Sequence, residues 1–182
     1  MNAPDYQQQN TDFVAQLVNL CKDDRGHRAA LRRWWSDGTK HYAYPSLGRL
    51  TKGIVDPRRS WVAAIYATHF KEGKTPHKES GNSIGHAALR LGKRNEKGEH
   101  PYDHHFRRLL ACSTTTELGP LLNRFVKRLS TNDDGYVSLD YVLLLRDFRR
   151  FNFNPQAVKT QWAKDFWKVE EADHQPETSA NP

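Results

Sequence analysis

The sequence has only two cysteines and no long apolar run. Cys21 and Cys112 stand far apart and cannot build the disulfide framework that small secreted domains use. No stretch approaches the ~20 apolar residues of a membrane-spanning helix, and the mean hydropathy is -0.86. The start, MNAPDYQQQNTDF, lacks the basic and apolar regions of a signal peptide. We therefore expect a cytoplasmic protein with reduced, structural cysteines and no membrane partner.

Common catalytic motifs are also missing. The sequence has no Gly-rich phosphate loop, no serine nucleophile elbow and no paired cysteine motif. Its acids lie mostly beside basic residues, so we expect no carboxylate cluster able to hold the two metals of a nuclease. These absences favour a protein without catalytic activity or cofactor, and metal analysis of purified protein would separate it from a metalloenzyme.

Two segments superficially resemble metal sites. Ser130, Asn132 and Asp134 match early positions of a calcium loop, but Tyr141 stands where that loop needs a bidentate Glu. We expect an Asp-Gly turn there, followed by a helix that Ser138 caps. His100, His104 and His105 include a pair at i, i+4 spacing. No third ligand has a suitable spacing, so exposed or phosphate-facing histidines are favoured over a metal site.

What the chain has in abundance is helical segments with an apolar face beside a basic one. In RGHRAALRRWW, the residues Arg25, Arg28 and Arg32 fall within about 60° of arc, next to Leu31 and Trp35. The same pattern recurs in three later segments. In LLNRFVKRL, the apolar face is Leu121, Leu122, Phe125 and Leu129, and the basic face is Arg124, Lys127 and Arg128. In LDYVLLLRDFRRF, the apolar residues Tyr141, Leu144, Leu145 and Phe148 oppose Arg146 and Arg150, and in PQAVKTQWAKDFWKV the apolar residues Val158, Trp162, Phe166 and Val169 align. Such helices are typical of a folded protein that lies along a polyanion.

The charge is uneven along the chain. Residues 25 to 108 contain 18 Lys or Arg and 7 Asp or Glu, whereas residues 111 to 182 contain 9 and 10. The net charge is +7, and basic residues gathered on helix faces indicate nucleic-acid binding. Among the tryptophans, Trp34, Trp61 and Trp162 are interpreted as core, and Trp35 is the best candidate for stacking on a base.

The periodicity predicts an all-α protein, a helical bundle of about eight or nine helices in two packed units. Asp12 is a plausible N-cap of the first helix, Asp56 before Pro57 is a strong helix start, and Ser83 can cap another helix. We expect a disordered N-terminus over 1–11, helical units over 12–113 and 114–169, and a disordered acidic tail over 170–182. Residues 71 to 82 are predicted to form a mobile loop.

The order of these segments resembles the CasB family, the small subunit of the type I-E CRISPR surveillance complex, Cascade. The resemblance covers about residues 12 to 169 and includes RGHRAALRR, HFRRLLAC, LLNRFVKRL, LDYVLLLRDFRRF and VKTQWAKDFW. It implies a non-catalytic helical protein that assembles as two copies, contacts the other Cascade subunits, and helps to stabilise the R-loop of crRNA and target DNA. The large subunit would read the protospacer-adjacent motif, and a separate helicase-nuclease would cut.

The candidate nucleic-acid-binding residues combine the helical pattern with this resemblance. Arg25 comes from the pattern, and the positions that match the basic residues of the family are Arg28, Arg32, Arg33, Arg107, Arg108, Arg124, Lys127, Arg128, Arg146, Arg149 and Arg150. The chain departs from the family at His104 and His105, where Arg or Glu is expected in many relatives.

Other functions remain open at this point. A free-standing helical DNA- or RNA-binding protein outside CRISPR would need a recognition helix, whereas the basic residues are spread over at least four helices. A basic bundle that binds only proteins would keep its nucleic-acid affinity unchanged after substitution of its arginines.

Overall fold

The computed structural model describes residues 3–51, 56–131 and 135–167, and these residues are mostly helical. Their elements, in chain order, are α1 (Ala3–Asp23), α2 (Arg25–Arg32), η1 (Arg33–Trp35), η2 (Lys40–Ala43), α3 (Tyr44–Thr51), α4 (Pro57–His69), α5 (Ile84–Leu89), α6 (Asp103–Ala111), α7 (Thr115–Thr131), α8 (Tyr141–Phe153) and α9 (Pro155–Trp167), where η denotes a 3-10 helix. Within the described ranges, the only β-type pairing is an isolated bridge between His77 and Leu139. The predicted all-α class is confirmed.

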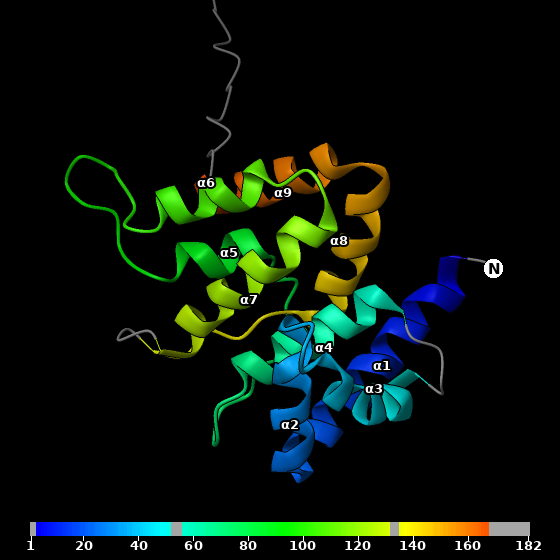
Figure 1. Cartoon of the computed structure of the whole chain (residues 1–182). Coiled ribbons are helices and arrows are strands. Elements are labelled where there is room, and N and C mark those ends of the chain that lie inside the picture. The colour runs from blue at the N-terminus through cyan, green and yellow to red at the C-terminus, as the bar shows by residue number, and fades with distance from the viewer. Residues whose placement is uncertain (1–2, 52–55, 132–134, 168–182) are drawn as a thin grey trace, which may run out of the picture.

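Helix α4 lies in the middle of the molecule (Figure 1). It packs against α2 on one side and against α7 and α8 on the other, while α5 packs against α9. One continuous hydrophobic core joins these helices. Its largest buried side chains include Tyr66, Phe106, Tyr141, Phe148, Phe151, Trp162 and Phe166. The division into units at residues 113 and 114 stays a prediction, and α5 and α9 pack together across it.

The N-terminal helix is longer than the sequence pattern predicts. It begins at Ala3, and Asp12 lies inside it, where its carboxylate accepts a hydrogen bond from Gln8. The polar run of residues 3 to 11 has few apolar side chains, but Tyr6 is held by Arg149, whose guanidinium lies 3.9 Å from the ring centroid. The prediction of disorder over residues 1–11 is therefore wrong for 3–11, and the predicted acidic tail lies outside the described residues.

The starts of α4 and α5 follow the predicted capping chemistry, whereas the start of α8 departs from it. Asp56 caps α4 by accepting from the backbone N–H of Arg58, and Ser83 caps α5. The cap of α8 is Asp140, which accepts from two backbone N–H groups of the first turn. Ser138, the predicted cap, instead donates to the carbonyl of Thr75, because the segment before α8 runs beside residues 75 to 78.

At Gly85, α5 comes close to the backbone of α9. A Cβ at this position would lie 2.1 Å from the backbone oxygen of Trp162, so one helix would have to move. We expect Gly85→Ala to lower the free energy of unfolding by about 1–3 kcal/mol, the cost of overpacking a core. Urea denaturation measures this loss. Gly48→Ala on α3 is the control, since a Cβ there meets nothing within 4 Å, and equal stability of the two variants would contradict the prediction.

Candidate nucleic-acid interface

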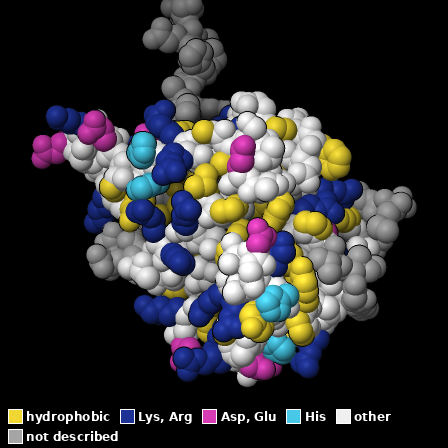
Figure 2. All heavy atoms as spheres, in the orientation of Figure 1, with side chains coloured by type: hydrophobic (Ala, Val, Ile, Leu, Met, Phe, Trp, Pro, Cys, Tyr) yellow, Lys and Arg dark blue, Asp and Glu magenta, His cyan; other side chains and the backbone are white. Residues whose placement is uncertain are grey.

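A basic groove lies between α6 and α7. Its volume is about 200 Å³, and it is lined by His105, Arg108, Leu109, Leu121, Arg124, Phe125 and Arg128. The structure thus brings together three of the predicted residues, Arg108 from one sequence segment and Arg124 and Arg128 from another. Figure 2 shows Lys and Arg side chains gathered beside histidines on the part of this face where α6 and α7 lie.

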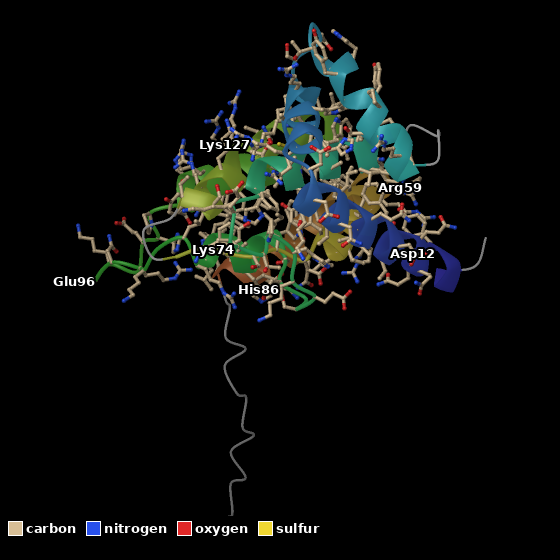
Figure 3. The ribbon with its side chains drawn as sticks, turned by 90° about the horizontal axis from the view of Figure 1, so that it is seen from below. Asp12, Arg59, Lys74, His86, Glu96 and Lys127 are labelled. Carbon is tan, nitrogen blue, oxygen red and sulfur yellow. The ribbon has the colours of Figure 1, made fainter. Side chains whose placement is uncertain are left out.

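Helical spacing explains how each helix contributes to this basic groove. On α6, Phe106 and Leu109 are buried, which leaves the adjoining Arg108 at the surface. On α7, Arg124 and Arg128 are four residues apart and therefore project from one face. Lys127 is also exposed and points outwards from α7 (Figure 3).

The part of the chain that the structure describes places no compensating acid in the groove. No carboxylate is among its lining residues, and among the described residues neither Arg108 nor Arg124 forms an ion pair. Arg128 lies 5.6 Å from the centroid of the Tyr102 ring. The acid of α6, Asp103, instead accepts from Arg107 Nε at 2.5 Å and from the indole of Trp167 at 2.9 Å. Arg107 is therefore partly neutralised, whereas the cations of the groove are open to an anion.

The three histidines have different environments. His105 lines the groove, and burial together with Arg128, His104 and Arg108 lowers its pKa. His104 is exposed, whereas His100 is buried. His100 Nε2 lies 3.1 Å from the carbonyl oxygens of Leu89 and Gly92, and its Nδ1 accepts from the backbone of Tyr102. The prediction that His100 is exposed or faces phosphate is wrong, because its buried ring is a hydrogen-bond partner for carbonyl groups at the end of α5 and just after it.

The predicted basic stripe on α2 has a structural role. Arg28 is 7% exposed and donates to the carbonyls of Cys21 and Lys22, at the C-terminal end of α1. Arg32 Nε donates to the carbonyl of Ala67 at 2.7 Å, near the C-terminal end of α4. Cations at helix C-termini satisfy carbonyls that lack intrahelical partners and interact favourably with the helix dipole.

This arrangement corrects the sequence interpretation of α2. The guanidinium of Arg28 also lies 4.4 Å from the centroid of the Phe70 ring, so it is enclosed and cannot form an exposed phosphate contact. Arg32 keeps an exposed part, and its contact with nucleic acid stays a prediction. The i, i+4 spacing of Arg28 and Arg32 predicts a surface stripe, because the sequence does not reveal that the ends of α1 and α4 approach α2.

The family model for the CRISPR-associated protein Cse2 matches residues 27–167, which is most of the chain. The chain belongs to the Cse2 family. This membership confirms the resemblance identified from the segment order.

Three solved structures share the fold of this Cse2-family chain. A chain of a CRISPR RNA-guided surveillance complex is 21% identical, with a TM-score of 0.68 over 90% of this chain and 93% of that one. CasB from Thermobifida fusca is 20% identical, with a TM-score of 0.64 over 89% and 95%. A Cse2-family protein from Thermus thermophilus is 20% identical, with a TM-score of 0.61 over 85% and 97%. No curated protein sequence gives a significant match.

The other predicted cations of this Cse2-family chain lie away from the groove lining. Arg25 and Arg33 are exposed, and the guanidinium of Arg33 is 4.6 Å from the centroid of the Tyr42 ring. On α8, the side chains of Arg146, Arg149 and Arg150 are exposed. Arg146 lies 3.9 Å from the carboxylate of Asp147, and Arg149 covers Tyr6. Nucleic-acid contacts of these five residues stay predictions.

Trp35 does not project freely from the surface. Its indole packs against the core, and a Cβ on Gly119 of α7 would lie 3.4 Å from its ring. The interpretation of Trp35 as the best base-stacking candidate is therefore not supported by its position. Trp162 is 1% exposed, and Trp34 and Trp61 are partly buried against the core, as predicted.

Two further findings concern metals and membranes. Across the described ranges, no three His, Cys, Asp or Glu side chains are grouped so that they could hold a metal ion. Asn132 and Asp134 of the candidate calcium loop lie outside these ranges. None of the described helices is both long and apolar enough to span a bilayer.

Proposed function

We propose that this Cse2-family chain is a non-catalytic small subunit of a crRNA-guided surveillance complex. It binds the phosphate backbone of crRNA or target DNA strands without reading their sequence. The groove between α6 and α7 is the main contact, and the exposed cations beside it extend the binding surface. Through these contacts, and through contacts with the other subunits and a second copy of itself, it stabilises the R-loop in antiviral defence.

The main support is the uncompensated positive charge of the groove. Arg108, Arg124 and Arg128 converge from two helices with no carboxylate among their lining neighbours. Arginines in a concave, partly desolvated site attract anions and suit phosphate geometry. The cations are not arranged on one recognition helix. This favours a surface that binds the phosphate backbone over a helix that contacts base edges.

Weak backbone contacts are sufficient for the proposed role. R-loop formation exchanges a DNA duplex for a heteroduplex of similar stability, so a modest preference for the opened strands shifts the balance. Phosphate contacts supply this preference equally at every target sequence. A sequence-independent subunit therefore suits a complex in which base pairing with the guide provides the specificity.

Fluorescence anisotropy with labelled single-stranded DNA and RNA tests this proposal. We expect binding that does not depend on sequence and that weakens with salt. The slope of log affinity against log salt should be about -2 when the groove and the exposed cations beside it together contact about three phosphates. Absence of binding at low salt, or sequence-selective binding that survives high salt, would contradict the proposal. Co-purification with a guide RNA and other subunits would distinguish the surveillance complex from a free-standing DNA- or RNA-binding protein.

A further inference from the structure

The groove between α6 and α7 has the size and charge of a pocket for one small anion. Its volume of about 200 Å³ is below the roughly 300–1,000 Å³ of pockets that enclose drug-sized ligands. Three guanidinium groups line it, and the rest of its wall is apolar apart from His105. Like charges in a concave site repel one another and are stabilised by an anion that fits among them.

His105 is the one lining residue whose ordinary pKa lies near neutral pH. The groups that face it from α6 and its N-terminal flank are Tyr102, whose ring centroid is 6.1 Å away, His104 at 5.9 Å, and Arg108. From α7 the facing groups are Arg124 and Arg128. No carboxylate is among these groups, so the described neighbours of the imidazole are all basic or neutral.

We propose that this pocket holds a single backbone phosphate and that His105 takes up one proton from solvent as the phosphate enters. The inference rests on the proposed function, since it specifies how one phosphate of the bound strand is held. The phosphodiester enters as a monoanion, the arginines stay charged, and the proton moves from water or buffer to the imidazole. No covalent bond of the strand forms or breaks.

The expected direction of the pH effect follows from the environment of His105. In the empty pocket, burial and then Arg128, His104 and Arg108 lower the pKa of His105, so the neutral ring predominates at neutral pH. A phosphate placed among these groups adds a negative charge, which raises that pKa. The bound state then holds more protons than the free state, and by linkage the affinity for the strand rises as the pH falls.

Oligothymidylate is a suitable probe because neither its bases nor its phosphodiesters titrate near neutral pH. Calorimetry in two buffers of different ionisation enthalpy measures the protons taken up on binding. We expect uptake by the wild-type protein and an affinity about fivefold higher at about pH 6 than at about pH 8, below the tenfold per pH unit that one proton allows. His105→Gln should remove most of the uptake, and His104→Gln on the exposed side of α6 should retain it.

The outcomes separate this inference from the proposed function. Strand binding without proton uptake, or uptake that persists in His105→Gln, would overturn the inference and leave the proposed function standing. Failure of the wild-type protein to bind at low salt would overturn both. An NMR titration of the His105 ring in wild-type protein, with and without oligothymidylate, gives a second measurement that needs no variant. An unchanged midpoint there would also overturn the inference.

Discussion

Replacing Arg108, Arg124 and Arg128 together by Gln is expected to lower the affinity for single-stranded DNA about 100-fold at roughly 0.1 M salt. Each phosphate contact to a single strand contributes about 0.7 to the slope of log affinity against log salt. At that salt concentration the loss of the one phosphate contact in the groove is therefore worth a factor of about 5. The charge-assisted hydrogen bonds that the guanidinium groups donate to this phosphate supply the remaining factor of about 20, or about 1.8 kcal/mol, which is within the roughly 1.5–3 kcal/mol of a hydrogen bond to a charged group. The magnitude of the salt slope should fall by about 0.7 at the same time.

The control for this variant removes the same charge elsewhere. Lys71, Lys74 and Lys78 are exposed, and none of them lines the groove. The triple Gln variant at these positions has the same net charge as the groove variant, so any general effect of charge is shared. Anisotropy measured on both proteins, with circular dichroism to confirm folding, gives the comparison. Equal losses of affinity would mean that the groove has no special role.

The faces of individual helices were predictable from the sequence. Along α7 and α8, the predicted apolar residues Leu122, Phe125, Leu144 and Phe148 are buried, and Arg124 and Arg128 project together as their spacing requires. The groove itself was not predictable, because its second wall is α6 and the crossing of α6 on α7 depends on tertiary packing. The position of His105 in the groove was not predictable either. The sequence pattern groups His105 with His100, although His105 lines the groove and His100 is buried.

Helix α2 shows where sequence reasoning fails for a physical reason. An arginine that binds phosphate and an arginine that satisfies the carbonyls of a helix end occupy the same kind of amphipathic position. Arg28 and Arg32 cap the ends of α1 and α4, and only the three-dimensional structure reveals those ends. Acidic substitutions at Arg28 would therefore disrupt the fold, so a test of nucleic-acid binding has to use the arginines of the groove.

Arg28→Ala is expected to lower the free energy of unfolding by about 3 kcal/mol, in the range for loss of buried hydrogen bonds to a charged group. The substitution leaves the carbonyls of Cys21 and Lys22 without their guanidinium donor and opens a space beside the Phe70 ring. Arg28→Lys keeps the charge, but an ammonium cannot match the planar fork that spans these partners. We expect this variant to lose less stability than Arg28→Ala, and urea denaturation ranks the two.

Arg25→Ala is the matched control for Arg28→Ala, since Arg25 is on the same helix and exposed. Surface substitutions of this kind usually change stability by less than about 0.5 kcal/mol. Under conditions where Arg28→Ala remains folded, its affinity for single-stranded DNA should equal that of the wild-type protein, because the Arg28 guanidinium is enclosed by α1 and Phe70 rather than open to a strand. A variant with wild-type stability and weakened DNA binding would reverse this assignment and return Arg28 to the nucleic-acid interface.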